Sequence, residues 1–195
     1  SDSNVQTAVV AGVVDTTAEA VEKVSKSLVR IKPQSSGMDS VTGFGIVVSK
    51  EGVIVTDKAS VAPLTNPVAV FHDGQQFPIQ VIQSQIDGDI VFVIPLIPPD
   101  KKNNVIVPAN FSSSVKLGQT ILALSGKNAE ALLQGIMEKV DGELRTSIDA
   151  NKTMIGSPLF TLAGEIIGFK TTSLMKDSTF YPINLLKPSI PGLVR

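Results

Sequence analysis

Four residues carry side chains that hydrolytic chemistry could use: Lys58, His72, Asp89 and Ser157. Ser157 lies in the stretch TMIGSPL (153–159). A serine attacks a carbonyl only when a base takes its proton and a carboxylate orients that base. His72, the only histidine, stands beside an Asp-Gly dipeptide that is typical of a hairpin turn. Because a hairpin-tip histidine usually faces solvent, we do not assign His72 a catalytic role.

The composition excludes several other kinds of chemistry. With no cysteine and one histidine, the chain has no disulfide, no thiolate nucleophile and no zinc-type cluster of ligands. No glycine-rich loop that could cradle a phosphate is present, and we expect neither a metal nor a cofactor. The net charge of −1 and the isoelectric point of about 5.8 give no electrostatic attraction to nucleic acid. We therefore expect no nucleic-acid partner.

The elements that must position these residues are mostly short strands. One helix is predicted over 15–29, where Val21, Val24 and Leu28 line one face. Eight β-branched runs are bounded by turn dipeptides and predict strands. These runs are FGIVVS (44–49), GVIVTD (52–57), PVAVFH (67–72), FPIQVIQS (77–84), IVFVIPL (90–96), TILALSG (120–126), SPLFTL (157–162) and EIIGFKTT (165–172).

The polar, proline-bearing stretch 98–116 is predicted to connect two β-rich halves. Separately, a second helix is an alternative over 128–137, although Gly135 and the flanking β-branched runs weaken that prediction. The 195 residues fit one large domain or two small ones. The fold class predicted is therefore all-β, an antiparallel barrel or sandwich with a short N-terminal helix.

Six segments in this order resemble the HtrA (Do-like) branch of the trypsin-fold serine proteases. They are EKVSKSLVRI, GFGIVVSKEGVIVTD, HDGQQFPIQVIQSQIDGDIVFVIPL, LGQTILALSG, IDANKTMIGSPLFTLAGEIIGFKTT and FYPINLL. The likeness runs from Val24 to about Pro188, with no PDZ segment after it. It implies two antiparallel β-barrels side by side, with a catalytic cleft between them. The divisions expected are an N-terminal arm and helix start (1–23), a first barrel (24–108) and a second barrel (109–195).

The resemblance also assigns the catalytic positions, and two of the three hold residues that cannot do the chemistry. The family's histidine, in a motif like IVTNxHVV, falls on Ala59 of IVTDKASV (54–61). Its carboxylate, in a motif like DLAVL, falls on Asp89, which we interpret as a turn residue or a buried hydrogen-bonded acid. Its nucleophile, in GNSGGPL, falls on Ile155, and Thr153 takes the place of the glycine whose N–H helps to form the oxyanion hole.

A second alignment stays open because the loop is two residues short between Asp149 and Pro158. A different gap placement puts Ser157 at the nucleophile position, and Lys58 could serve as its base if desolvation lowered the pKa of the amine. Nothing around Lys58 in the sequence indicates burial. We therefore interpret Lys58 and Asp57 as a solvated pair.

The function predicted is a catalytically inactive trypsin-like homologue that binds a protein or an extended peptide. One alternative is an active serine hydrolase with a Ser157/Lys58 dyad. Another is a structural or assembly domain of a larger membrane-attached protein, with the apolar stretch VQTAVVAGVV (5–14) as an assembly element. No run reaches the length of a membrane span. The start at Ser-Asp-Ser, without Met, is compatible with an export signal or anchor removed before residue 1, so we expect an exported, periplasmic or extracellular location.

Overall fold

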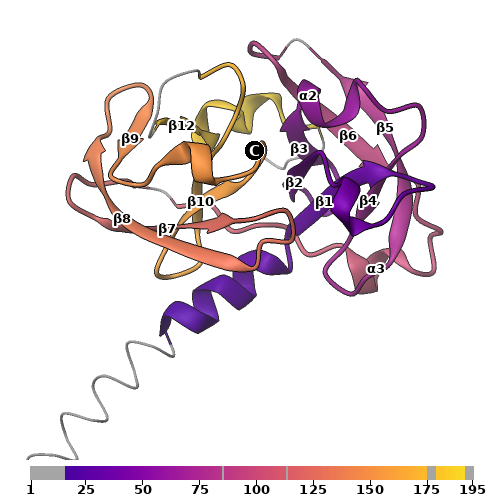
Figure 1. Ribbon diagram of the computed structural model, residues 1–195, viewed down its shortest axis with the longest axis horizontal. Helices are drawn as coiled ribbons and strands as arrows, with labels where there is room; N and C mark the ends of the chain where they lie inside the picture. The colour runs from indigo at the N-terminus through magenta and orange to yellow at the C-terminus, as the bar shows by residue number, and fades with distance from the viewer. Residues whose placement is uncertain (1–15, 85, 113, 175–178, 192–195) are drawn as a thin grey trace, which may run out of the picture.

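The computed structural model describes residues 16–84, 86–112, 114–174 and 179–191, and within them the chain forms two closed antiparallel barrels of six strands each (Figure 1). The first barrel closes in the order β1-β2-β3-β6-β5-β4. Its strands are β1 (Leu28–Pro33), β2 (Gly43–Val47), β3 (Ile54–Asp57), β4 (Pro67–Val70), β5 (Gln76–Gln83) and β6 (Ile90–Pro95). The double barrel expected from the resemblance is confirmed.

The second barrel closes in the order β10-β11-β12-β9-β8-β7. Its strands are β7 (Thr120–Ser125), β8 (Ala131–Lys139), β9 (Leu144–Thr146), β10 (Pro158–Thr161), β11 (Ile166–Phe169) and β12 (Thr179–Pro182). Short helical turns complete the described chain: α2 (Lys58–Val61), α3 (Lys102–Val105), η1 (Met38–Ser40), η2 (Ala150–Lys152), η3 (Ile183–Leu185) and η4 (Lys187–Ser189).

Each of the eight predicted runs contains a strand, whereas β1, β8, β9 and β12 were not among the predicted strands. The alternative helix over 128–137 is wrong, because Ala131–Lys139 is β8. Gly135 pairs with Ile121 of β7, and a β-carbon at this position would meet Ser147 and Ile148. The 98–116 stretch joins β6 to β7 and contains the single turn α3.

Three apolar cores hold the molecule together. One fills the first barrel around Val29, Ile54 and Val93, and another fills the second barrel around Ile121, Leu159 and Phe180. The third lies between the barrels and combines residues of both, with Phe44, Phe92 and Ile90 from the first and Leu122, Phe160 and Phe169 from the second. Strands β2 and β3 are buried on both faces for this reason, since one face looks into the barrel and the other toward the partner barrel.

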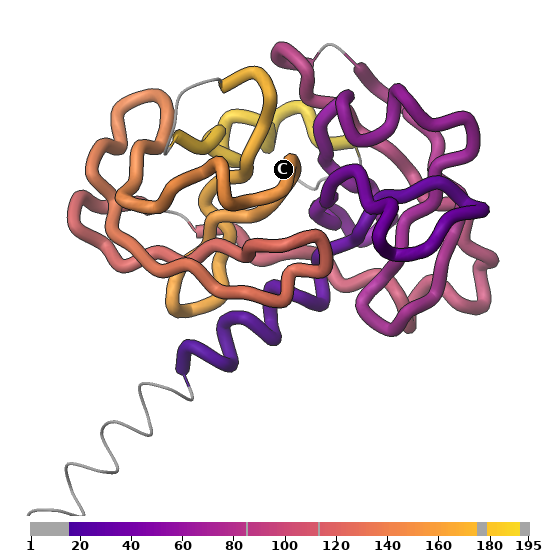
Figure 2. Tube along the Cα trace, in the orientation of Figure 1, coloured from indigo at the N-terminus to yellow at the C-terminus, as the bar shows by residue number. Residues whose placement is uncertain are grey.

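Within the described residues the N-terminal helix covers 16–25, so it ends four residues before the predicted end at 29. It ends because residues 26 and 27 form a turn and Leu28 begins β1. Ala20 and Val24 are buried in the core between the barrels, and the Nζ of Lys23 donates to the carbonyl of Ala163 at 3.3 Å. Figure 2 shows the helix leading up to the junction of the two barrels, below the second. The stretch 5–14, predicted as an assembly element, lies outside the described residues.

Candidate active site

The first-barrel corner of the candidate site is the junction of β3 and α2. Asp57 ends β3, and its Oδ1 accepts a hydrogen bond from the backbone N–H of Ala59 at 2.8 Å, which caps the helix. Ala59 is exposed in the first turn of α2. The position that the resemblance assigns to the proton-accepting imidazole therefore carries a methyl group, which can neither take nor give a proton.

The carboxylate of Asp57 ties this corner to the second barrel. Asp57 is fully buried, and its Oδ2 accepts from the Thr171 hydroxyl at 2.7 Å and from the Thr172 N–H at 2.7 Å. The Thr172 hydroxyl lies 2.8 Å from the same oxygen. A buried carboxylate is stable only when its oxygens are hydrogen-bonded, and these donors come from the segment after β11. Asp57 thus acts as a hydrogen-bonded link between the barrels.

Asp89, the position assigned to the family's carboxylate, lies beside this link but faces solvent. Its Oδ2 lies 3.1 Å from the Thr172 hydroxyl, and its N–H donates to the Ser173 hydroxyl at 2.8 Å. Its carbonyl accepts from the Lys58 N–H at 2.7 Å. The interpretation of Asp89 as a buried acid is therefore wrong, and the turn interpretation agrees with its place immediately before β6.

The expectation of a solvated Asp57–Lys58 pair is also wrong. Asp57 is buried and receives its hydrogen bonds from Ala59, Thr171 and Thr172, whereas Lys58 is exposed. The two residues are adjacent in the sequence, but Asp57 is the inward-facing end of a strand and Lys58 begins a surface helix.

The second-barrel corner is the loop 149–157, which is held by its own backbone and by the first barrel. Asp149 caps η2 through a hydrogen bond from the Asn151 N–H at 3.0 Å. The Thr153 N–H donates back to the Ala150 carbonyl at 3.1 Å, so it is engaged where the family's oxyanion donor would be free. The carbonyl of Ile155 accepts from the Phe44 N–H of β2 at 2.7 Å. Half-buried Met154 packs against the core between the barrels.

Ser157, the other nucleophile candidate, is fully buried. Its hydroxyl donates to the carbonyl of Leu124 in β7 at 2.9 Å, and its N–H donates to the Met154 carbonyl at 3.0 Å. In the part of the chain that the structure describes, no hydrogen bond joins Ser157 to Lys58. The two members of the alternative dyad therefore lie in different environments. The Ser157 hydroxyl is buried against β7 of the second barrel, whereas Lys58 is exposed on the first barrel.

His72 lies in the turn between β4 and β5 and is exposed, as the Asp-Gly dipeptide beside it predicts. Among the described residues, no group of three or more His, Asp or Glu side chains could hold a metal ion. No helix in those same ranges is long and apolar enough to cross a membrane.

The residues that sequence reasoning missed are Asp57, Thr171 and Thr172. An Asp between a strand and a helix is a known capping signal, so the contact with Ala59 could have been found. The contacts with the two threonines could not, because they join residues 114 or 115 positions apart in the chain.

Comparison with known proteins agrees with this architecture. Residues 43–169 match the Trypsin-like peptidase domain. The chain is 27% identical over 173 residues to a probable periplasmic serine endoprotease, DegP-like, of Chlamydia pneumoniae, which covers 83% of the chain and 34% of that protein. It is 22% identical over 149 residues to the serine endoprotease DegS of Haemophilus influenzae, covering 70% of the chain and 43% of that protein.

A DegP-like periplasmic endoprotease of Pseudomonas fluorescens is 22% identical over 157 residues, which cover 75% of the chain and 32% of that protein. The matched part thus spans less than half the length of these relatives. The family match covers more than half of the chain and lies on the two barrels described above. The chain belongs to the trypsin-like peptidase family, in its HtrA branch with the DegP-like and DegS endoproteases.

Proposed function

We propose that this chain is a catalytically inactive member of its family that acts by binding a protein or an extended peptide. One observation carries the proposal: Ala59 stands in the first turn of α2, where the family's general base would stand. Without a base, a serine hydroxyl is almost unreactive at neutral pH, and loss of the base costs on the order of a million-fold in turnover.

The second-barrel loop supports the same conclusion. Ile155 has no hydroxyl, and the N–H of Thr153 is engaged within its own turn. The Ser157 hydroxyl is buried and donates to a backbone carbonyl. A Ser157/Lys58 dyad would need the hydroxyl to leave Leu124 and reach solvent, and no contact in the described residues favours that movement.

The kind of ligand follows from the fold rather than from a single contact. Both barrels are closed, and a hydrogen bond between Asp57 and Thr171 joins them. The surface that could bind a polypeptide is therefore kept, although Ala59 and Ile155 replace the catalytic side chains. An extended peptide or a neighbouring protein is the ligand we propose. Because the DegP-like relatives are named periplasmic, we also propose that the chain works outside the cytoplasm. No observation favours the membrane-attached assembly domain.

Proteolysis assays on the purified chain test the proposal. We expect no cleavage of unfolded casein above the buffer control and no labelling by a fluorophosphonate, measured by intact mass. Turnover that disappears in Ser157→Ala would overturn the proposal. Ser49→Ala is the matched control, because Ser49 is also a buried serine with a backbone hydrogen bond, to the N–H of Val53 at 3.1 Å, and lies in the first barrel. Activity lost in both variants would indicate damage to the fold rather than loss of a nucleophile.

A further inference from the structure

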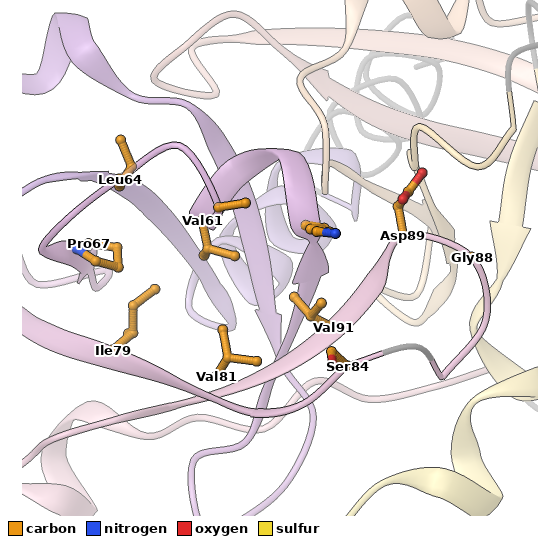
Figure 3. Close-up of a pocket in the computed structure, with 11 residues that line it drawn as sticks. Val61, Leu64, Pro67, Ile79, Val81, Ser84, Gly88, Asp89 and Val91 are labelled. Carbon is orange, nitrogen blue, oxygen red and sulfur yellow. The ribbon is translucent and has the colours of Figure 1, made fainter.

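A hollow of about 540 Å³ with an aliphatic wall and a polar rim opens on the first barrel, between α2 with the residues after it and strands β5 and β6. Figure 3 shows Val61, Ile79, Val81 and Val91 around the same space. Leu64 and Pro67 extend the aliphatic wall. This hollow is separate from the loop 149–157 and uses residues of the first barrel alone.

The hollow exists because the barrel is incomplete at this end. Along β5, Phe77 and Ile79 face inward and are buried, at 8% exposure each. Val81 is next in the same alternation, yet 47% of it is exposed. The neighbouring strand β4 begins at Pro67 and pairs only as far as Val68 with Pro78, so nothing continues β4 beside Val81. An inward-facing valine therefore lies open at the end of the barrel.

On the side toward β4, the backbone of β5 also has no paired strand at this point, although on the other side Val81 lies opposite Val93 of β6. The Leu96 N–H donates to the Pro78 carbonyl at 2.8 Å, so the even-numbered residues of β5 direct their polar groups toward β6. Odd-numbered residues direct theirs toward β4, as the hydrogen bond from the Phe71 N–H to the Gln75 carbonyl at 2.9 Å, at the start of the same hairpin, shows. At Val81 there is no strand on that side. Its N–H and C=O form a short open edge, which is the kind of edge that an added peptide strand pairs with.

A cation stands at the rim of the hollow. Lys58 lines it, and in the described ranges its Nζ has neither a hydrogen-bond acceptor nor an ion-pair partner. Asp89 also borders the hollow, but Figure 3 shows it directed away from Val81 and Val91, and its Oδ2 is within reach of the Thr172 hydroxyl. One charge of each sign therefore borders the hollow, and the one without a hydrogen-bond partner in the described ranges is the ammonium of Lys58, which is complementary to a carboxylate.

We propose that this hollow binds the C-terminal end of an extended polypeptide from a partner protein. An aliphatic side chain fills the space lined by Val61, Ile79 and Val91. The peptide backbone pairs with Val81 as a continuation of β4, and the terminal carboxylate lies against Lys58. Binding at this hollow does not depend on whether the protein cleaves peptides. The peptide-binding experiment and the proteolysis assay can therefore fail independently of each other.

A labelled hexapeptide tests the site directly. The probe is fluorescein-labelled Thr-Val-Thr-Val-Thr-Leu with a free carboxylate, titrated with the full chain and followed by fluorescence anisotropy. Val81→Glu places a charge in the hollow, and we expect it to weaken binding by about tenfold or more. Ile82→Glu is the matched control, because Ile82 is 44% exposed and does not line the hollow. Its affinity should stay within about twofold of the wild type.

The contact with Lys58 is tested by a two-by-two comparison. Amidation of the peptide and Lys58→Gln should each weaken binding by about fivefold, and the two changes together should weaken it no further. Amide chemical shifts in nuclear magnetic resonance spectra should move first at Val81 and Ile79. An additive loss would exclude the proposed carboxylate contact.

Three results would overturn the proposal. The first is absence of binding at millimolar probe. The second is displacement of the probe by octanoate together with octanoate shifts confined to the methyl groups, which would assign the hollow to an aliphatic acid. The third is concentration-dependent shifts of Val81 without any peptide, which would assign it to a second copy of this chain.

Discussion

The two corners of the candidate site depart from the family's motifs in different ways. At the first-barrel corner only a side chain differs: the strand-to-helix junction persists, Ala59 occupies the first turn, and the buried Asp57 holds the junction to the second barrel. At the second-barrel corner the backbone itself is engaged. The Thr153 N–H, the Ile155 carbonyl and the Ser157 hydroxyl are all hydrogen-bonded to the protein.

The difference teaches that the two corners depart from the family's catalytic motifs at two levels, a side chain at the first and the backbone at the second. One substitution at Ala59 could restore the missing imidazole, because this position is exposed. A loop whose amide and carbonyl groups pair with its own turn and with β2 cannot be restored by one side chain. The loop has instead become part of the contact between the barrels.

The largest effect should come from the glycine of that loop. Gly156 has φ +86°, and a β-carbon on it would collide with the Phe44 carbonyl. We expect Gly156→Ala to lower the free energy of unfolding by about 4 kcal/mol, because neither backbone can move without separating the barrels. Urea denaturation measures it.

Gly74 gives the control, because it has the same φ of +86° but nothing near its added β-carbon. Gly74→Ala should lower the free energy of unfolding by only about 1 kcal/mol, which is the cost of a positive φ for a residue with a β-carbon. Equal losses in the two variants would show that the contact between the loop and β2 contributes nothing.

Removal of the Asp57 carboxylate should have the next largest effect. Asp57→Ala leaves the buried Thr171 hydroxyl without its acceptor and removes the cap of α2. We expect a loss of about 3 kcal/mol in the free energy of unfolding. Asp89→Ala, a change at an exposed carboxylate beside it, should cost about 0.5 kcal/mol. If the two variants are equally stable, Asp57 is not the link between the barrels that its contacts indicate.

A smaller effect is expected at Tyr181, the only tyrosine, whose hydroxyl donates to Asp87 of the first barrel at 2.6 Å. Burial raises the pKa of Tyr181 above its usual value, and the hydrogen bond and negative charge of Asp87 raise it further. The folded state therefore holds the protonated form more tightly than the unfolded chain does. Stability from this contact is complete below the unfolded pKa of about 10 and falls as pH rises through the folded pKa.

Phenolate absorbance measures this titration without interference from another tyrosine. We expect Asp87→Asn to lower the pKa of Tyr181 and Tyr181→Phe to cost about 1 kcal/mol at neutral pH. An alkaline transition of the same midpoint with and without Asp87 would contradict the contact.

Rebuilding the catalytic pair should have the smallest effect. The double variant Ala59→His with Ile155→Ser should raise casein cleavage by less than about tenfold over the unmodified chain, because the Thr153 N–H remains engaged with Ala150 and the oxyanion is unsupported. A strongly active double variant would mean that the two corners differ only in side chains. Adding Thr153→Gly sharpens the comparison, since it frees the turn at the oxyanion position.

Much of the fold could be predicted from local patterns. The β-branched runs between Asp-Gly and Glu-Gly turns predict eight strands correctly, because alternation and turn residues act over a few positions. The prediction for 128–137 was ambiguous because the exposed face of β8 carries Leu132 and Ile136, which weakens the alternation of polar and apolar residues that indicates a strand. The N-terminal helix ends early because Leu28 pairs with Ile46 in β1, a contact that helical periodicity cannot indicate.

The sequence by itself determined that Ala59 has no proton to exchange and that no cysteine or histidine cluster can replace it, since these are properties of side-chain type. Tertiary structure alone decided that Asp57 is buried while its neighbour Lys58 is free, that Ser157 faces Leu124, and that Val81 lies open beyond the end of β4. The physical reason is that burial and hydrogen-bond partners depend on which distant strands close the barrels.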